Sequence, residues 1–169
     1  MVSLNYIQEE TATVWTDTGG DKLLDLGSLG PGSLAMGAYL DLGTLSKADW
    51  YEAVLKIDGY SSNASVGDIF ELWFAQSNDA SNFDGQPTTA PGASTQGTIT
   101  ADQRFNCMPC LFIRAYSATL ADVIQGRCRI KLTSRYIAPI VVNRSSAGVL
   151  QGTGDSHTLT LTPIPQEGQ

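Results

Sequence analysis

Strict alternation of apolar and charged residues is the feature that most limits how this chain can fold. In "RCRIKLTSRY" (127–136), Cys128, Ile130 and Leu132 alternate with basic and hydroxyl side chains. The stretch "WYEAVLKID" (50–58) alternates in the same way. Successive residues of a strand point to opposite faces of a sheet, so both stretches predict strands with one buried face.

Other stretches predict more strands and little helix. "DIFELWFAQ" (68–76) carries apolar residues on both parities, which predicts a strand covered on both faces. We expect further strands near 11–16, 34–42, 97–100, 111–116, 139–143 and 157–162. The segments "LSKADW" (45–50) and "TLADVIQG" (119–126) each predict a helical turn or two.

These elements predict one all-β domain. The 169 residues suffice for a single sizeable core, and no internal repeat or domain linker interrupts them. Many short strands joined by Gly-, Pro- and Asn-rich loops predict a single antiparallel β-sandwich that resembles a jelly roll. We expect an extended N-terminal arm (1–10), the sandwich (11–162) and an extended C-terminal tail (163–169). The long loop at 77–97 is a candidate functional loop.

Charge is distributed unevenly along the chain. The net charge is −7, yet residues 1–102 hold fourteen acidic and three basic side chains, while residues 103–169 hold three acidic and seven basic ones. This asymmetry predicts that late strands contact early strands, within one subunit or between subunits. An acidic total argues against nucleic acid as a partner. No apolar run could span a bilayer and no signal peptide is evident, so we expect no membrane partner and synthesis in the cytoplasm.

The motif Cys107-Met108-Pro109-Cys110 raises the question of redox or metal chemistry. In an unbroken strand, residues i and i+3 point to opposite faces about 10 Å apart, too far for a disulfide. Pro109 predicts a sheet edge or a bulge, and a bulge would bring the two sulfurs closer. With an odd cysteine count, we expect all three thiols, Cys128 included, to be reduced, buried and free of metal.

Two further patterns suggest chemistry but fit structural roles better. A zinc site would need four ligands, and the chain could offer Cys107, Cys110, Cys128 and His157. Cys128, however, has the apolar parity of its strand. In "GTGDSH" (152–157), Ser156 and His157 are adjacent at a predicted hairpin, so they point apart and do not form a hydrolase pair. We expect no catalytic residue, no metal and no cofactor.

Binding of calcium or sugar is also considered. The loop oxygens of Asp79, Asn82 and Asp84 could hold calcium, but their spacing differs from the EF-hand pattern, and a solvated loop is favoured. Exposed aromatic rings could stack on a glycan, and the chain offers Trp15, Trp50, Trp73, Tyr51 and Tyr60. Core packing is the usual role of such rings in a sandwich.

A row of cations is the strongest candidate for a contact surface. Odd positions from 127 onward place four basic residues on one face of one strand: Arg127, Arg129, Lys131 and Arg135. Two interpretations stay open. The row is either a solvated face that discourages edge pairing or an electrostatic contact with an acidic partner. Arg114 and Arg144 could extend it.

Several segments resemble a known group of proteins. "RIKLTSRYIAPIVVNRSSAGVL" (129–150), followed by "HTLTLTPIPQ" (157–166), resembles the C-terminal part of small virion structural proteins of tailed bacteriophages. "WYEAVLKIDG" (50–59) and "GDIFELWFAQSND" (67–79) resemble their central strands. Within that group the chain is most similar to head decoration (cement) proteins, which implies a β-sandwich on the capsid exterior.

The resemblance implies a mechanical role without catalysis. It implies the major capsid protein as partner, a location on the outside of the virion, and a homo-oligomer, with a trimer favoured. We expect contacts through the arm, the cation row and the tail: Leu4, Tyr6, Ile7, Arg127, Arg129, Lys131, Arg135, Ile164 and Pro165. The alternatives are a tail or fibre component and a carbohydrate-binding module for host attachment.

Overall fold

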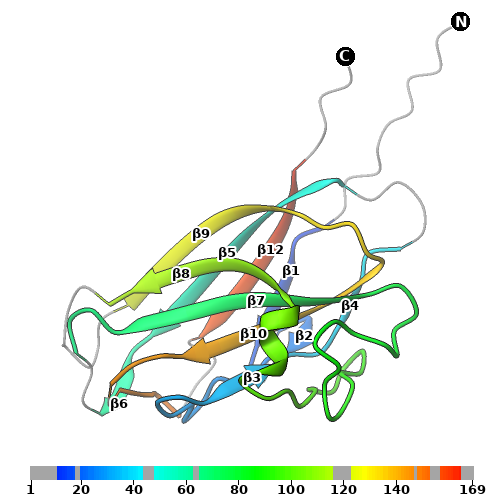
Figure 1. Ribbon diagram of the computed structural model, residues 1–169. Helices are drawn as coiled ribbons and strands as arrows, with labels where there is room; N and C mark the ends of the chain where they lie inside the picture. The colour runs from blue at the N-terminus through cyan, green and yellow to red at the C-terminus, as the bar shows by residue number, and fades with distance from the viewer. Residues whose placement is uncertain are drawn as a thin grey trace, which may run out of the picture.

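Most of the predicted strands are present, and they form two facing sheets that are antiparallel except where β1 and β2 pair in parallel (Figure 1). The computed structural model describes residues 11–17, 20–43, 48–62, 65–115, 123–146, 148–152 and 157–164. One sheet, which we call sheet A, has the order β2–β1–β12–β5–β9. Its strands are β1 (Thr13–Thr16), β2 (Lys22–Leu23), β5 (Trp50–Asp58), β9 (Val123–Lys131) and β12 (Thr158–Ile164).

The facing sheet, sheet B, has the order β3–β10–β7–β8, and β4 also pairs with β10. Its strands are β3 (Leu34–Met36), β4 (Leu40–Asp41), β7 (Ile69–Ser77), β8 (Met108–Arg114) and β10 (Tyr136–Asn143). A small third sheet pairs β6 (Tyr60–Ser62) with β11 (Val149–Leu150). One short 3₁₀ helix, η1 (Gln103–Asn106), precedes β8.

The strand order is that of a jelly roll. The antiparallel pairs are nested along the chain: β1 with β12, β3 with β10, β5 with β9, and β7 with β8. The pairs alternate between the two sheets, so each sheet holds four of these eight strands. Two sheets of nested antiparallel strands define the jelly-roll sandwich. The predicted fold class is therefore confirmed.

The main core lies between the sheets and follows the predicted parity. Along β5 the odd residues are buried and the even ones are partly or fully exposed, as the alternation predicted. Tyr51, Leu55 and Ile57 of this strand pack in the core with Phe70 and Phe74 of β7. Burial of apolar surface between the two layers is the main force that holds the sheets together.

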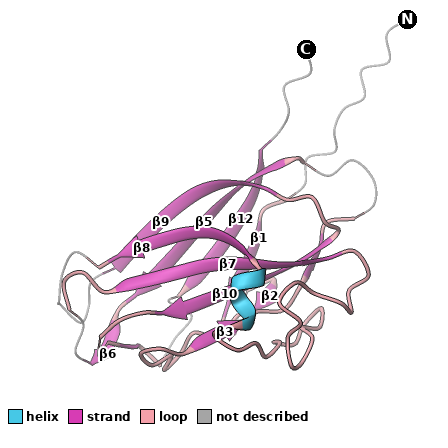
Figure 2. Ribbon diagram, viewed as in Figure 1, coloured by secondary structure: helices cyan, strands magenta, loops and turns pink. Residues whose placement is uncertain are grey.

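Sheet B is also covered on its outer side, which explains the apolar residues on both parities of β7. The loop that leads from β7 through η1 to β8 lies over this face (Figure 2). It buries a second apolar cluster that joins Phe83, Ile99 and Cys107 of the loop to Trp73 and Ile140 of the sheet. The long loop is thus a structural cover that is tied to the sheet.

The sequence prediction differs from the structure in several elements. Residues 123–126, predicted as helix, form the start of β9, because Ile124 packs in the main core. In the segment 97–100, predicted as a strand, only Gly97 and Thr98 form isolated bridges. β12 runs to Ile164, so Pro163 and Ile164 of the predicted tail belong to the sandwich. No helix among the described residues is long and apolar enough to cross a membrane.

The uneven charge distribution is resolved within the subunit. β9, β10 and β12 each pair with strands from the acidic first part of the chain. Ion pairs follow this arrangement and join late arginines to early carboxylates: Arg104–Glu71, Arg127–Glu52, Arg135–Asp41 and Arg144–Glu71. The predicted contact of late strands with early strands is confirmed.

Candidate interaction surface

The outer face of sheet A carries most of the predicted cation row. β9 exposes Arg127, Arg129 and Lys131, while Ile130 between them points into the core. β9 is the last strand of sheet A, so the three cations lie along one edge of the sandwich. Their common direction follows from the two-residue period of the strand.

Two of the predicted contact residues, Lys131 and Ile164, lie at one end of this row, on either side of Trp50. The register pairs Lys131 with Trp50 on β5, and Trp50 with Ile164 on β12. The indole of Trp50 is 46% exposed, which is unusual for so large an apolar side chain. We call the surface formed by Arg127, Arg129, Lys131, Trp50 and Ile164 the basic face.

The charges of the basic face are only partly balanced. Arg127 Nη1 lies 3.9 Å from Glu52 Oε1, and both side chains are substantially exposed, so this pair adds little stability. Within the part of the chain that the structure describes, the side chains of Arg129 and Lys131 make no ion pair or hydrogen bond. Two cations next to an exposed tryptophan are therefore available to an acidic partner.

Arg135 does not belong to this surface, and its placement on the same strand was wrong. β9 ends at Lys131, and the chain turns before β10 begins at Tyr136. Arg135 instead donates from Nε and Nη2 to the two carboxylate oxygens of Asp41, at 2.9 and 2.8 Å, and lies over the ring of Tyr136. The hydrogen bonds from Arg135 lower the pKa of the Asp41 carboxyl.

Four predicted contact residues lie outside the described residues: Leu4, Tyr6, Ile7 and Pro165. The structure does fix where the flanking segments attach. Thr13 of β1 pairs with Leu161 of β12, so the start of β1 and the end of β12 lie at the same end of the sandwich. That end also holds Trp50 and Lys131, which pair at the beginning of β5 and the end of β9.

The prediction that all cysteines are reduced was wrong for two of them. Cys110 on β8 forms a disulfide with Cys128 on β9, with a Cα separation of 6.7 Å. The two strands belong to different sheets but lie side by side at one edge of the sandwich (Figure 1). Strand parity excluded only a bond between Cys110 and the nearby Cys107. The fold instead brings together Cys110 and Cys128, which are 18 residues apart.

The geometry of the C-x-P-C motif itself agrees with its prediction. β8 is an edge strand, and its register with β7 shifts by one residue between Pro109 and Leu111, which leaves Cys110 as the bulged residue. Cys110 packs against the main core, whereas Cys107 is a buried free thiol in the second cluster. Burial and the nearby Asp84 charge raise the pKa of the Cys107 thiol to about 12, so it stays protonated.

The described residues of the possible zinc and hydrolase sites make structural contacts instead. The possible zinc ligands are divided between the β8–β9 disulfide and the loop cluster, and no group of three or more ligands occurs among the described residues. His157 is fully buried. Its Nδ1 accepts from the Asp58 amide at 3.0 Å and its Nε2 lies 3.0 Å from the Gln151 carbonyl oxygen, so both ring nitrogens are engaged. Ser156 lies outside the described residues.

The acidic loop is organised by its own backbone. Asp79 accepts hydrogen bonds from the amides of Ser81 and Asn82 and from the Asn82 side chain, at 2.7 to 2.9 Å. These bonds lower the pKa of Asp79 and use both of its oxygens to shape a turn. Beside this turn lies an open hollow of about 720 Å³, lined by Asn82, Asp84 and other polar groups.

Most of the aromatic rings considered for glycan stacking are buried. Trp15, Trp73, Tyr51 and Tyr60 are each at most 8% exposed. Trp15 also donates its indole N–H to the Ala38 carbonyl at 2.8 Å, which ties it to the core. Of the five candidates, Trp50 alone presents its ring to solvent, and it belongs to the basic face.

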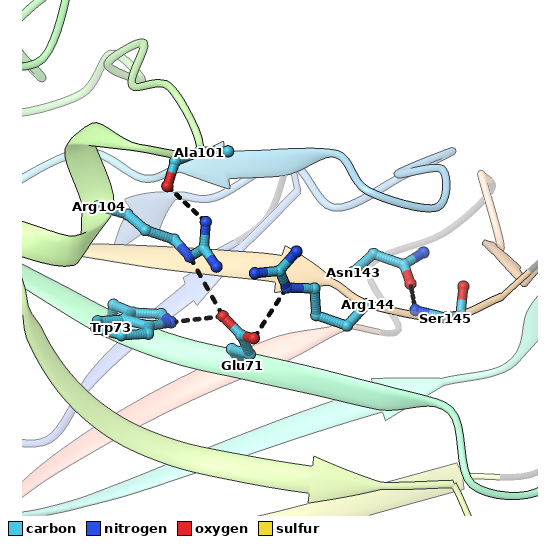
Figure 3. A network of polar contacts seen from close by, with 7 residues as sticks. All are labelled: Glu71, Trp73, Ala101, Arg104, Asn143, Arg144 and Ser145. Carbon is cyan, nitrogen blue, oxygen red and sulfur yellow. Dashed lines mark hydrogen bonds and ion pairs between the residues drawn. The ribbon is translucent and has the colours of Figure 1, made fainter.

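A buried charged network on the outer side of sheet B was missed by the sequence prediction (Figure 3). Glu71 of β7 accepts from Arg144 Nε at 2.9 Å, Trp73 Nε1 at 2.9 Å and Arg104 Nε at 3.3 Å. Burial raises the pKa of Glu71. The hydrogen bonds from Arg144 and Trp73 and the charges of the two arginines together lower this pKa by a larger amount, so the net shift is downward. Parity had placed Glu71 and Trp73 on one face, but Arg104 and Arg144 lie outside the strands.

Comparisons with known proteins add a fold likeness only. No protein-family model and no curated protein matches the sequence. Similar solved structures include murine APRIL at pH 5.0, with 6% identity over 91% of this chain and 98% of that chain, at a TM-score of 0.44. They also include Eiger TNF from S. frugiperda, with 7% identity over 96% and 97% of the two chains, at a TM-score of 0.42. At such values the likeness carries no functional argument, and the jelly-roll assignment follows from the strand order.

Proposed function

We propose that this chain is a non-enzymatic structural protein of a tailed-bacteriophage virion, which binds the outside of the capsid and stabilises it. The basic face is the observation that carries the proposal. It combines two unpaired cations, Arg129 and Lys131, with the exposed ring of Trp50. The sequence resemblance of 129–150 and 157–166 to virion proteins supports the same role.

Each part of the basic face has a distinct task in this proposal. The cations attract an acidic patch of the major capsid protein and set the orientation of docking. Trp50 and Ile164 then bury apolar surface at the contact, which supplies affinity that salt does not screen. A homo-oligomer, with a trimer favoured, engages several capsid subunits at once, so that its avidity exceeds the affinity of one face. Binding to the assembled shell alone stabilises that shell by mass action.

The test is co-sedimentation with empty capsids prepared from the corresponding phage without this protein. Binding should weaken when salt rises from about 0.05 M to about 0.5 M. The variant Arg129→Glu/Lys131→Glu should bind about tenfold more weakly or worse. Arg135→Gln is the control, because Arg135 lies off β9 and is engaged by Asp41. If the unmodified protein neither sediments with the shells nor raises their melting temperature, decoration is the wrong function.

The alternative role, a tail or fibre part or a sugar-binding module in host attachment, has one observation in its favour. The hollow beside the long loop has a polar lining that includes Asp84, Gln86 and Asn106, which suits hydroxyl groups. A glycan-array signal that is lost with Asn106→Ala or Trp50→Ala, in a protein that ignores capsids, would favour this alternative.

A further inference from the structure

Arg104 is a buried charge whose hydrogen bonds are incomplete. The side chain is 1% exposed, and its Nη2 atom has no hydrogen-bond partner. The great majority of buried polar groups in proteins have a hydrogen-bond partner, so an unpaired guanidinium nitrogen calls for a specific explanation. Nε donates to Glu71 and Nη1 donates to the Ala101 carbonyl. Nη2 is therefore the one guanidinium nitrogen without a hydrogen-bond acceptor.

The guanidinium of Arg104 packs against two aromatic rings and faces a second arginine. Its central carbon lies 4.2 Å from the Phe105 ring centre and 5.6 Å from that of Trp73, so both rings attract its charge. Figure 3 shows the free nitrogen of Arg104 directed toward the guanidinium of Arg144. Glu71 is the acid between them, so two positive charges share one negative charge.

Exposed apolar side chains surround this charged centre. Phe105 and Phe112 are each 61% exposed, and each meets the Trp73 ring edge-on, at 6.0 and 6.2 Å between centres. Ile69, on the same face of β7 as Glu71, is 38% exposed. Large rings left in solvent beside arginines are typical of protein-binding hot spots.

We infer that this centre is a docking site for a protein segment that presents a carboxylate next to an apolar side chain. The carboxylate would bind Arg104 Nη2 and Arg144 and would balance the excess positive charge, since arginine pairs of this kind favour carboxylate oxygens. Arg144, whose side chain is 41% exposed, is the residue that turns outward to admit it. The neighbouring apolar side chain would pack on Phe105 and Phe112.

The chemistry of the rim favours a protein over a sugar as the occupant. Phenylalanine offers apolar area but no hydroxyl or amide for the many polar groups of a glycan. The site lies on the outer side of sheet B, whereas the basic face lies on sheet A. It therefore does not depend on the proposed capsid role and leaves a second surface for another protein.

The test is NMR of the ¹⁵N-labelled full chain with the probe acetyl-Phe-Glu-Leu-amide and its Gln counterpart. The Glu peptide should shift the side-chain Nε–Hε signals of Arg104 and Arg144. Its affinity should exceed that of the Gln peptide by about tenfold. Arg144→Gln and Phe112→Ala should each weaken binding, because both side chains are exposed and can change without unfolding the core. Arg129→Gln, on sheet A, is the matched control and should bind normally.

Several results would overturn the inference. Equal affinities for the Glu and Gln peptides would remove the role of the carboxylate. No shift of either arginine signal at about 10 mM peptide would remove the site itself. The same shifts produced by glucuronate at lower concentration than by the peptide would identify a sugar acid as the occupant. Loss of binding in Arg129→Gln but not in Arg144→Gln would move the contact to the basic face.

Discussion

The disulfide between β8 and β9 gives a stability prediction whose size can be worked out. It joins Cys110 and Cys128, which are 18 residues apart, across the edge where the two sheets meet. Such a bond restricts the unfolded chain, and the loop-entropy relation for this separation gives about 3 kcal/mol. Reduction should therefore lower the free energy of unfolding by about 3 kcal/mol, chiefly through the greater freedom of the unfolded chain.

Urea unfolding of the air-oxidised protein, followed by tryptophan fluorescence, measures this effect with and without reductant. Reductant should move the midpoint to lower urea. The double variant Cys110→Ser/Cys128→Ser should have a lower midpoint that no longer responds to reductant. Cys107→Ala should keep the response, because Cys107 is a free thiol. Thiol titration of the unfolded chain should find one thiol before reduction and three after it.

Two results would refute this reasoning in different ways. Three thiols before reduction would show that Cys110 and Cys128 are not bonded, as the sequence alone had predicted. One thiol before reduction, together with identical midpoints in both conditions, would show that the bond forms but does not restrict the unfolded chain.

Three further predictions concern packing, pH and the surface ion pair. Gly126→Ala should lower the free energy of unfolding in urea by about 1–3 kcal/mol, because its Cβ would overlap the Ile113 Cγ2 of β8. Gly30→Ala should change it little, because the atom nearest to its Cβ would be Ser33 Oγ at 4.0 Å. The lowered pKa of Glu71 means that its contribution to stability is present above its unfolded value of 4.5 and is lost as pH falls through its folded pKa. Glu71→Gln should therefore lose less stability than the unmodified protein between about pH 5 and about pH 3, and an equal loss would contradict the assigned shift. Arg135→Ala should leave the midpoint of thermal unfolding almost unchanged, since the Asp41 pair is partly exposed to solvent, and a large drop in the midpoint would show that Arg135 supports the core.

Strand identity could be predicted because it depends on local parity. The even and odd residues of β5 separate into outer and core faces as the alternation indicated. The double burial of β7 also followed from its pattern, although the loop that covers it could not be identified. The start of β9 was mistaken for helix, since "TLADVIQG" has no clear alternation and its strand form depends on contacts with β5.

The chemistry of side-chain pairs could be predicted less well, because it depends on which distant strands meet. Cys110 and Cys128 come together only after both sheets have formed. The Glu71 network likewise needs Arg104 from the helix before β8 and Arg144 from the end of β10. The prediction of the basic row is correct as far as Lys131, where β9 ends. It fails at Arg135, because the turn after β9 interrupts the alternation of faces.

The central claim is that the basic face binds the outside of a phage capsid. A cryo-electron microscopy map of the intact virion tests it most directly. We expect jelly-roll density on the capsid exterior, with β9 facing the shell and Arg129, Lys131 and Trp50 at the contact. Density for this chain in the tail or fibre, or on the capsid with the outer side of sheet B facing the shell, would contradict the claim.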